Sequence, residues 1–168
     1  MKLFVRSSLV LACAALLVWS ATDRAFSHCE IPCGIYGDRT RIDLLFEDIQ
    51  TIEKSMKQIK NPAINFNQRT RWVHNKEEHA KKIQNVVMQY FMTQRVKPKP
   101  AGDAGRDKYV AQLTSLHHVM VHAMKAKQTT DVAHCKHMRD QLHAFAAAYF
   151  SAEDLKHIRE HHGHTEKK

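Results

Sequence analysis

Apolar residues recur at alternating spacings of three and four after residue 40, and this spacing limits the fold more than any other feature of the chain. It places apolar side chains along one stripe of an α-helix. Strand signals are absent from the sequence, so we expect an all-α protein. The first stripe comprises Ile42, Leu45, Ile49, Ile52, Met56 and Ile59, and Asn61-Pro62 ends its helix.

Three further helices follow the same rule. We expect the second over about residues 65–94, with Val73, Ala80, Ile83, Val87 and Tyr90 sharing one face. The segment 97–102 contains two prolines and a glycine and predicts an extended connection. The third helix is expected over about residues 106–127, with Tyr109, Leu113, Leu116, Met120 and Ala123 inward. The fourth follows the candidate N-caps Thr129, Thr130 and Asp131 and aligns Cys135, Met138, Leu142, Phe145 and Tyr149.

Short links between four helices predict an antiparallel four-helix bundle over about residues 39–160. Ser151 to Asp154 has the form of a capping box, which predicts a short extra turn at the end.

The first 27 residues are typical of an export signal: a positive start precedes an apolar run at residues 7–19 that is too short to span a bilayer. Ala25-Phe26-Ser27 supplies the small residues that signal peptidase reads, so we expect cleavage before His28. Residues 28–168 would then form the mature domain, periplasmic or secreted, without stable insertion in a membrane. A lipoprotein signal at Cys13 is a poorer alternative, because apolar residues would remain beyond that cysteine.

Cleavage there would leave His28 at the N-terminus, with Cys29 and Cys33 shortly after it. A free N-terminal amine has a pKa near roughly 7.7–8.0, so a divalent metal can displace its proton near neutral pH. The amine, the Cys29 amide and the Cys29 thiolate close two five-membered chelate rings. With the Cys33 thiolate, two nitrogens and two sulfurs lie in a plane, which favours Ni(II) or Cu(II) over tetrahedral zinc. These strong donors indicate a redox site.

Residues 28–36, HCEIPCGIY, resemble the hook of the nickel superoxide dismutase family, whose pattern is His-Cys-x-x-Pro-Cys-Gly-x-Tyr. A weaker resemblance continues through Arg71-Trp72-Val73, Lys76 to Ala80 and Tyr90-Phe91. It covers roughly the first half of the mature chain, while the second half matches mainly in helical pattern.

The resemblance implies one nickel ion per subunit, bound by the His28 amine and imidazole, the Cys29 amide and thiolate, and the Cys33 thiolate. It implies an antioxidant enzyme that converts superoxide to hydrogen peroxide and dioxygen as nickel cycles between Ni(II) and Ni(III). The family fold is a four-helix bundle behind the hook, and the family forms homohexamers, so the resemblance also implies a homo-oligomer.

The resemblance further implies roles beside the metal. Tyr36 and Tyr90 would order anion and water there, although simple core packing is the alternative for both. The family places a glutamate and an arginine behind the N-terminal histidine; here Asp43 and His79 occupy those positions, and each is otherwise an ordinary helix residue. The hook positions that would shape the turn and the anion pocket are Glu30, Pro32, Cys33 and Gly34.

The chain is basic, with a formal net charge of +9. Removal of residues 1–27 leaves about +7 by the same count. No basic and aromatic motif accompanies this charge, so we expect steering of a small anion rather than nucleic-acid binding. Arg95 and Lys97 contribute to this charge and, taken singly, are expected to be ordinary surface residues.

Histidine is abundant and supports a rival hypothesis, an exported metal-binding or metal-delivery protein without turnover. The sequence contains 13 histidines. His118 and His122 are spaced i, i+4 and His134 and His137 are spaced i, i+3, spacings that bind metal on a helix or simply lie in solvent. The tail adds His161, His162 and His164, and Cys135 is left without an assigned role.

Overall fold

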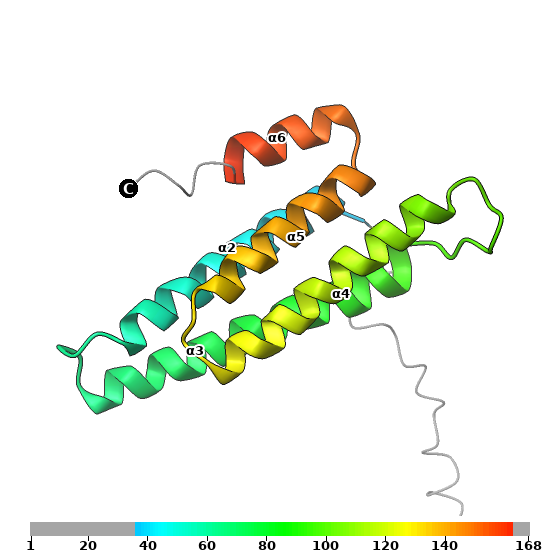
Figure 1. The fold of residues 1–168 in the computed structure, drawn as a ribbon. Helices are drawn as coiled ribbons and strands as arrows, with labels where there is room; N and C mark the ends of the chain where they lie inside the picture. The colour runs from blue at the N-terminus through cyan, green and yellow to red at the C-terminus, as the bar shows by residue number, and fades with distance from the viewer. Residues whose placement is uncertain (1–35, 163–168) are drawn as a thin grey trace, which may run out of the picture. The chain divides into compact units, whose positions relative to one another are not determined.

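The computed structural model describes residues 36–162, apart from the side chains at positions 157, 159, 161 and 162. All of them belong to one compact unit, residues 31–168. The hook residues 28–35 lie outside this description. The elements are α2 (Asp38–Ile59), α3 (Phe66–Asn85), η1 (Val86–Arg95), α4 (Arg106–Gln128), α5 (Ala133–Tyr149) and α6 (Ala152–His162), with no strand among the described residues (Figure 1). The expected all-α class is confirmed.

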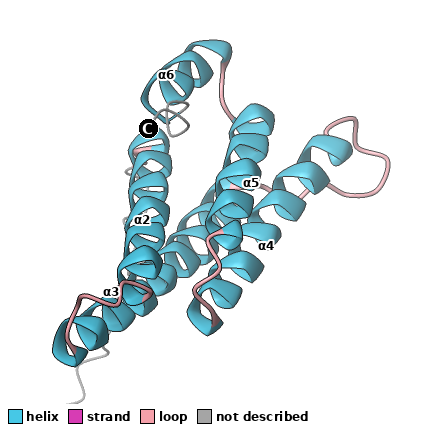
Figure 2. Ribbon diagram, turned by 60° about the vertical axis from the view of Figure 1, so that its left-hand side comes forward, coloured by secondary structure: helices cyan, strands magenta, loops and turns pink. Residues whose placement is uncertain are grey.

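Four long helices form the bundle. α2 packs against α3 and α5, and α4 packs against the same two helices, so the four close into a ring of neighbours. Short connections make sequential helices antiparallel, as Figure 1 shows. The π-helix η1 continues α3 and packs against α4, while α6 folds back onto α2 (Figure 2). The expected helical bundle is confirmed.

Local capping explains several helix boundaries. The Asn65 side chain accepts a hydrogen bond from the Gln68 amide at 2.9 Å and caps α3. Before α5, the Asp131 carboxylate accepts one from the Ala133 amide, also at 2.9 Å. The extra turn predicted after residue 151 is a longer helix, α6, whose first-turn amide at Asp154 donates to the Ser151 hydroxyl at 3.3 Å.

The core lies between the four long helices and follows the predicted stripes closely. Its fully buried large side chains come from α2, α3, η1, α4 and α5: Ile42, Leu45, Ile49, Ile52, Met56, Ile83, Tyr90, Phe91, Leu116, Met138, Leu142 and Phe145. Cys135 is also fully buried, and its thiol donates to the Met56 sulfur at 3.8 Å. Burial raises the pKa of this thiol to about 12, so it stays protonated and unreactive at neutral pH.

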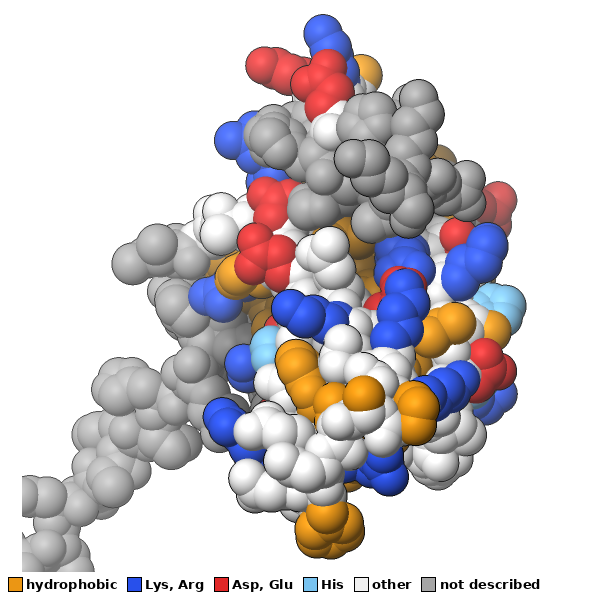
Figure 3. Space-filling model, turned by 90° about the vertical axis from the view of Figure 1, so that its left-hand side faces the viewer, with side chains coloured by type: hydrophobic (Ala, Val, Ile, Leu, Met, Phe, Trp, Pro, Cys, Tyr) orange, Lys and Arg blue, Asp and Glu red, His pale blue; other side chains and the backbone are white. Residues whose placement is uncertain are grey.

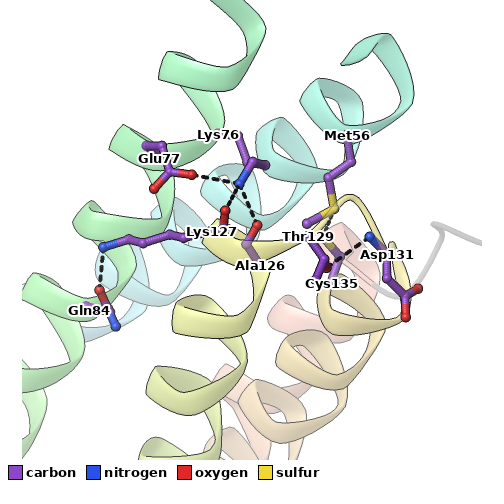
Figure 4. Close-up of polar contacts among 9 residues, drawn as sticks. All are labelled: Met56, Lys76, Glu77, Gln84, Ala126, Lys127, Thr129, Asp131 and Cys135. Carbon is purple, nitrogen blue, oxygen red and sulfur yellow. Dashed lines mark hydrogen bonds and ion pairs between the residues drawn. The ribbon is translucent and has the colours of Figure 1, made fainter. Parts of the chain in front are cut away.

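One position of the α3 stripe differs from the expectation. Val73 is 40% exposed, whereas Lys76 is buried. The Lys76 ammonium donates to the Ala126 carbonyl at 2.8 Å and to the Lys127 carbonyl at the end of α4, and it pairs with Glu77 at 2.7 Å (Figure 4). The lysine thus satisfies carbonyls that the last turn of a helix leaves without partners.

The segment expected to end the second helix as an α-helix is instead the π-helix η1. Its last turn is closed by the Val96 amide donating to the Phe91 carbonyl, five residues back, at 2.8 Å. Residues five positions apart lie about 140° apart around an α-helix, but the wider π turn brings them close to the same side of the helix. This difference decides where Arg95 points.

One face of the molecule carries a mixture of charged side chains. On the face drawn in Figure 3, lysines and arginines are scattered among acidic and apolar side chains instead of forming one continuous basic patch. Within residues 36–162, none of the helices combines the length and the apolar character needed to cross a membrane.

Candidate active site

The ligands expected from the sequence, His28, Cys29 and Cys33, lie outside the described residues, as do Glu30, Pro32 and Gly34. The description begins at Tyr36, three residues beyond Cys33. The described part of the site therefore consists of the side chains around Tyr36 and the first turn of α2.

The Asp38 carboxylate is the centre of these groups. It lies in the first turn of α2, where the helix dipole favours a negative charge. Its Oδ1 accepts from the Tyr90 hydroxyl at 2.6 Å and from Arg95 Nε at 2.8 Å. Its Oδ2 accepts from Arg95 Nη2 and from the Tyr149 hydroxyl, each at 2.7 Å. One carboxylate therefore joins α2, η1 and α5.

These bonds set the charge of the cluster. Burial alone would raise the pKa of Asp38, but hydrogen bonds from Arg95, Tyr90 and Tyr149 outweigh it and lower the pKa below its ordinary value. Asp38 is therefore ionised at neutral pH. The Arg95 side chain is 26% exposed and forms a fork with both carboxylate oxygens, a strong ion-pair geometry.

The two phenols bound to Asp38 are held in their neutral form. Burial and the bond to the Asp38 carboxylate raise the pKa of Tyr90 well above its usual range. The same two causes raise the pKa of Tyr149 to about 12. Both hydroxyl protons are directed at Asp38, so neither phenol is a proton donor to a second partner.

Tyr36 rests on this cluster. The Arg95 guanidinium lies over its ring at 4.1 Å from the centroid, a cation–π contact. The rings of Tyr36 and Tyr90 meet edge to face at 5.9 Å and 75°. Arg41 lies over the other aromatic ring, that of Tyr90, at 5.3 Å. The tyrosines singled out from the sequence are thus neighbours, and Tyr36 remains 38% exposed.

Sequence reasoning missed Asp38, Tyr149 and the role of Arg95. Arg95 was expected to be an ordinary surface residue, but it lies between Asp38 and Tyr36. A carboxylate two residues after Tyr36 is a weak signal, since acidic residues are common in the first turn of any helix. Tyr149 was predicted only as a member of the apolar stripe of its helix. Such a stripe does not predict which group the tyrosine hydroxyl binds.

The other two predicted site residues lie further along the bundle. His79 Nδ1 contacts Asp48 Oδ1 at 2.6 Å, which links α3 to α2. Asp43 lies five residues before Asp48 on α2 and is partly buried. Burial raises the pKa of Asp48, and the bond from His79 opposes that rise without cancelling it.

The described residues define an all-helical bundle in which Tyr36, three residues beyond the expected ligand Cys33, is held by Arg95 and Tyr90. The chain belongs to the family described as nickel-containing superoxide dismutase, whose sequence profile matches residues 23–153. That range includes the hook, the four long helices and every residue of the Asp38 cluster. No curated protein and no solved structure matches the chain.

Family membership identifies the chain as a nickel-dependent superoxide dismutase with superoxide as its substrate. It favours the enzyme over the rival carrier without turnover. Among the described residues, no three or more His, Cys, Asp or Glu side chains are grouped so as to hold a metal ion. That finding does not extend to the hook.

Proposed function

We propose that dismutation takes place at the hook, with one nickel ion per subunit held by the His28 amine and imidazole, the Cys29 amide and thiolate, and the Cys33 thiolate. Imidazole and amine nitrogens and thiolates are donor types that suit nickel. The observation that carries this assignment is Tyr36: it follows the last ligand by three residues and is held by Arg95 and Tyr90. Bound nickel would supply the redox chemistry by alternating between Ni(II) and Ni(III).

Side chains of the protein would position the substrate and attract it to the site. Tyr36 is partly exposed, so we assign its hydroxyl to ordering the incoming anion and water beside the hook. Tyr90 directs its hydroxyl proton to Asp38 at 2.6 Å and acts on the reaction through its contact with the Tyr36 ring. Arg41, which lies over the Tyr90 ring, adds positive charge near Tyr36, and this charge attracts a small anion. Pro32 and Gly34 would shape the turn, and the backbone amides of Glu30 and Cys33 would donate hydrogen bonds to the incoming anion.

Asp43 and His79 would support the His28 imidazole.

The hook requires a defined N-terminus, so the proposal includes export and processing. Signal peptidase would cut before His28, and the mature domain, residues 28–168, would work in the periplasm or outside the cell as a homohexamer. Intact mass of the protein from its native compartment tests the cut. A chain that begins at another residue would contradict this part of the proposal.

The decisive test of the hook adds one residue before His28 and leaves the rest of the mature chain unchanged. The extra residue moves the amine and destroys the first chelate ring, so we expect superoxide consumption to fall to the background rate. The control adds one residue after Lys168, which should leave activity intact. Circular dichroism verifies that both proteins keep the helical bundle. Full activity in the N-terminally extended protein would exclude the hook mechanism.

A further inference from the structure

A cluster of imidazoles lies where α4 and α5 meet, apart from the Asp38 cluster. His122 on α4 faces His134 in the first turn of α5, with their Nδ1 atoms 3.2 Å apart. The His137 ring stacks on the His122 ring at 4.5 Å and 25°, which holds the orientation of His122. The helical spacings in the sequence grouped these histidines within each helix, but the closest pair joins two helices.

The separation of the two nitrogens matches a particular metal geometry. Zinc binds imidazole nitrogen at about 2.0–2.1 Å, so two nitrogens on a tetrahedral zinc ion lie about 3.3 Å apart. Ligands at right angles in a square plane would lie about 2.9 Å apart at the same bond length. The pair is therefore spaced for a tetrahedral ion, unlike the planar donor set expected in the hook.

The two nitrogens share a hydrogen bond, which a bound metal ion would replace. Both rings are partly buried, at the end of the bundle where α4 turns into α5. A neutral imidazole is the form that binds metal.

We propose that His122 and His134 bind a zinc ion that links α4 to α5, with water completing the coordination. His137 supports the site by packing against His122. This site lies away from the Asp38 cluster, because His134 and Tyr149 are fifteen positions apart on α5, which corresponds to roughly 22 Å of helix. A bridge between two helices stabilises the folded state by mass action.

The test titrates the nickel-loaded mature protein with Zn²⁺ alone, measuring bound zinc by equilibrium dialysis and the melting temperature in parallel. We expect a zinc equivalent and a rise in Tm that both disappear in the H122A/H134A variant. The matched control, H74A/H117A, removes two exposed histidines and should retain both effects. Equal zinc binding and Tm in all three proteins would overturn the proposal, as would an equal loss in the control.

Two further measurements distinguish the bridge from a zinc site within α4 and from a variant that fails to fold. The single variant H118A should keep the zinc equivalent; its loss would assign zinc to the i, i+4 pair within α4 and reject the bridge. If H122A/H134A fails to fold, the imidazole NMR signals of the unchanged protein show which histidines bind zinc. Substoichiometric zinc should shift the signals of His122 and His134 first, and an earlier shift at other histidines would exclude the site.

Discussion

At the scale of single residues, Asp38 has the largest set of partners in the described part of the candidate site. Three donors from two elements converge on it, and it leaves only 18% of its side chain exposed. Removing its charge would leave the Arg95 guanidinium without its anion. Losing one partner of such a group costs more free energy than the intact contact contributes, because the remaining partner is left without its bond.

We expect Asp38→Asn to reduce the free energy of unfolding by about 1–3 kcal/mol. Because Tyr36 rests on Arg95 and Tyr90, kcat/KM should also fall by about ten- to a hundredfold through misplacement. Urea unfolding and pulse-radiolysis kinetics measure the two effects. Asp140→Asn is the control: its pair with Lys136 is 51% exposed at the aspartate, and its loss should cost under about 0.5 kcal/mol.

The same carboxylate predicts a pH dependence. The folded-state pKa of Asp38 lies below its ordinary value of 3.8, so its bonds contribute fully above that pH and are lost as pH falls through the lowered pKa. The difference in unfolding free energy between the unaltered protein and Asp38→Asn should therefore be constant near neutrality and shrink in acid. Asp48 has the opposite shift but is present in both proteins. A difference that grows below pH 3.8 would contradict the assignment.

At the scale of elements, the π-helix η1 determines where Arg95 points. Thr93 is exposed within it, and its hydroxyl donates to the Met88 carbonyl, five residues back, at 2.8 Å. Deleting Thr93 removes one residue between Tyr90 and Arg95 and should return the segment toward α-helical geometry.

We expect the Thr93 deletion to keep most of the helix and to leave Arg95 on the side of Tyr90, because residues four apart lie about 40° apart around an α-helix. Activity should then stay close to that of the unaltered protein, as it should in Thr93→Ala. Circular dichroism and superoxide consumption measure the two. A loss of activity as large as that of Asp38→Asn would contradict this expectation and would show that Arg95 depends on the π-helical backbone itself.

The junction between α3 and the end of α4 depends on Lys76. Lys76→Met keeps the length of the side chain but leaves the Ala126 and Lys127 carbonyls without this donor, so the unfolding free energy should fall by about 1–3 kcal/mol. Lys81→Met, an exposed lysine on the same helix, is the matched control and should have little effect. Thermal and urea unfolding provide the measurement, and equal losses in both variants would refute the junction.

At the scale of the whole molecule, the apolar stripes predicted the bundle well, because each stripe can be buried only against other helices. The residues that differ from the prediction depend on partners that are distant in the sequence. Lys76 is buried because its acceptors, fifty residues later in the chain, end α4, and no local pattern reports that. Arg95 reaches Asp38 only because the backbone widens into a π-helix. Tyr36 was found from the hook motif and Tyr90 from the weaker family resemblance beyond it, whereas the carboxylate that binds Tyr90 has no motif of its own.

The Asp38 cluster also constrains how this protein can diverge. Its carboxylate, guanidinium and two phenols satisfy one another, so the loss of any one member leaves the others with unmet charge or hydrogen bonds. Single substitutions at positions 38, 90, 95 and 149 should therefore be rare among natural relatives, and paired replacements should be enriched. The four positions would then vary together among members of the family.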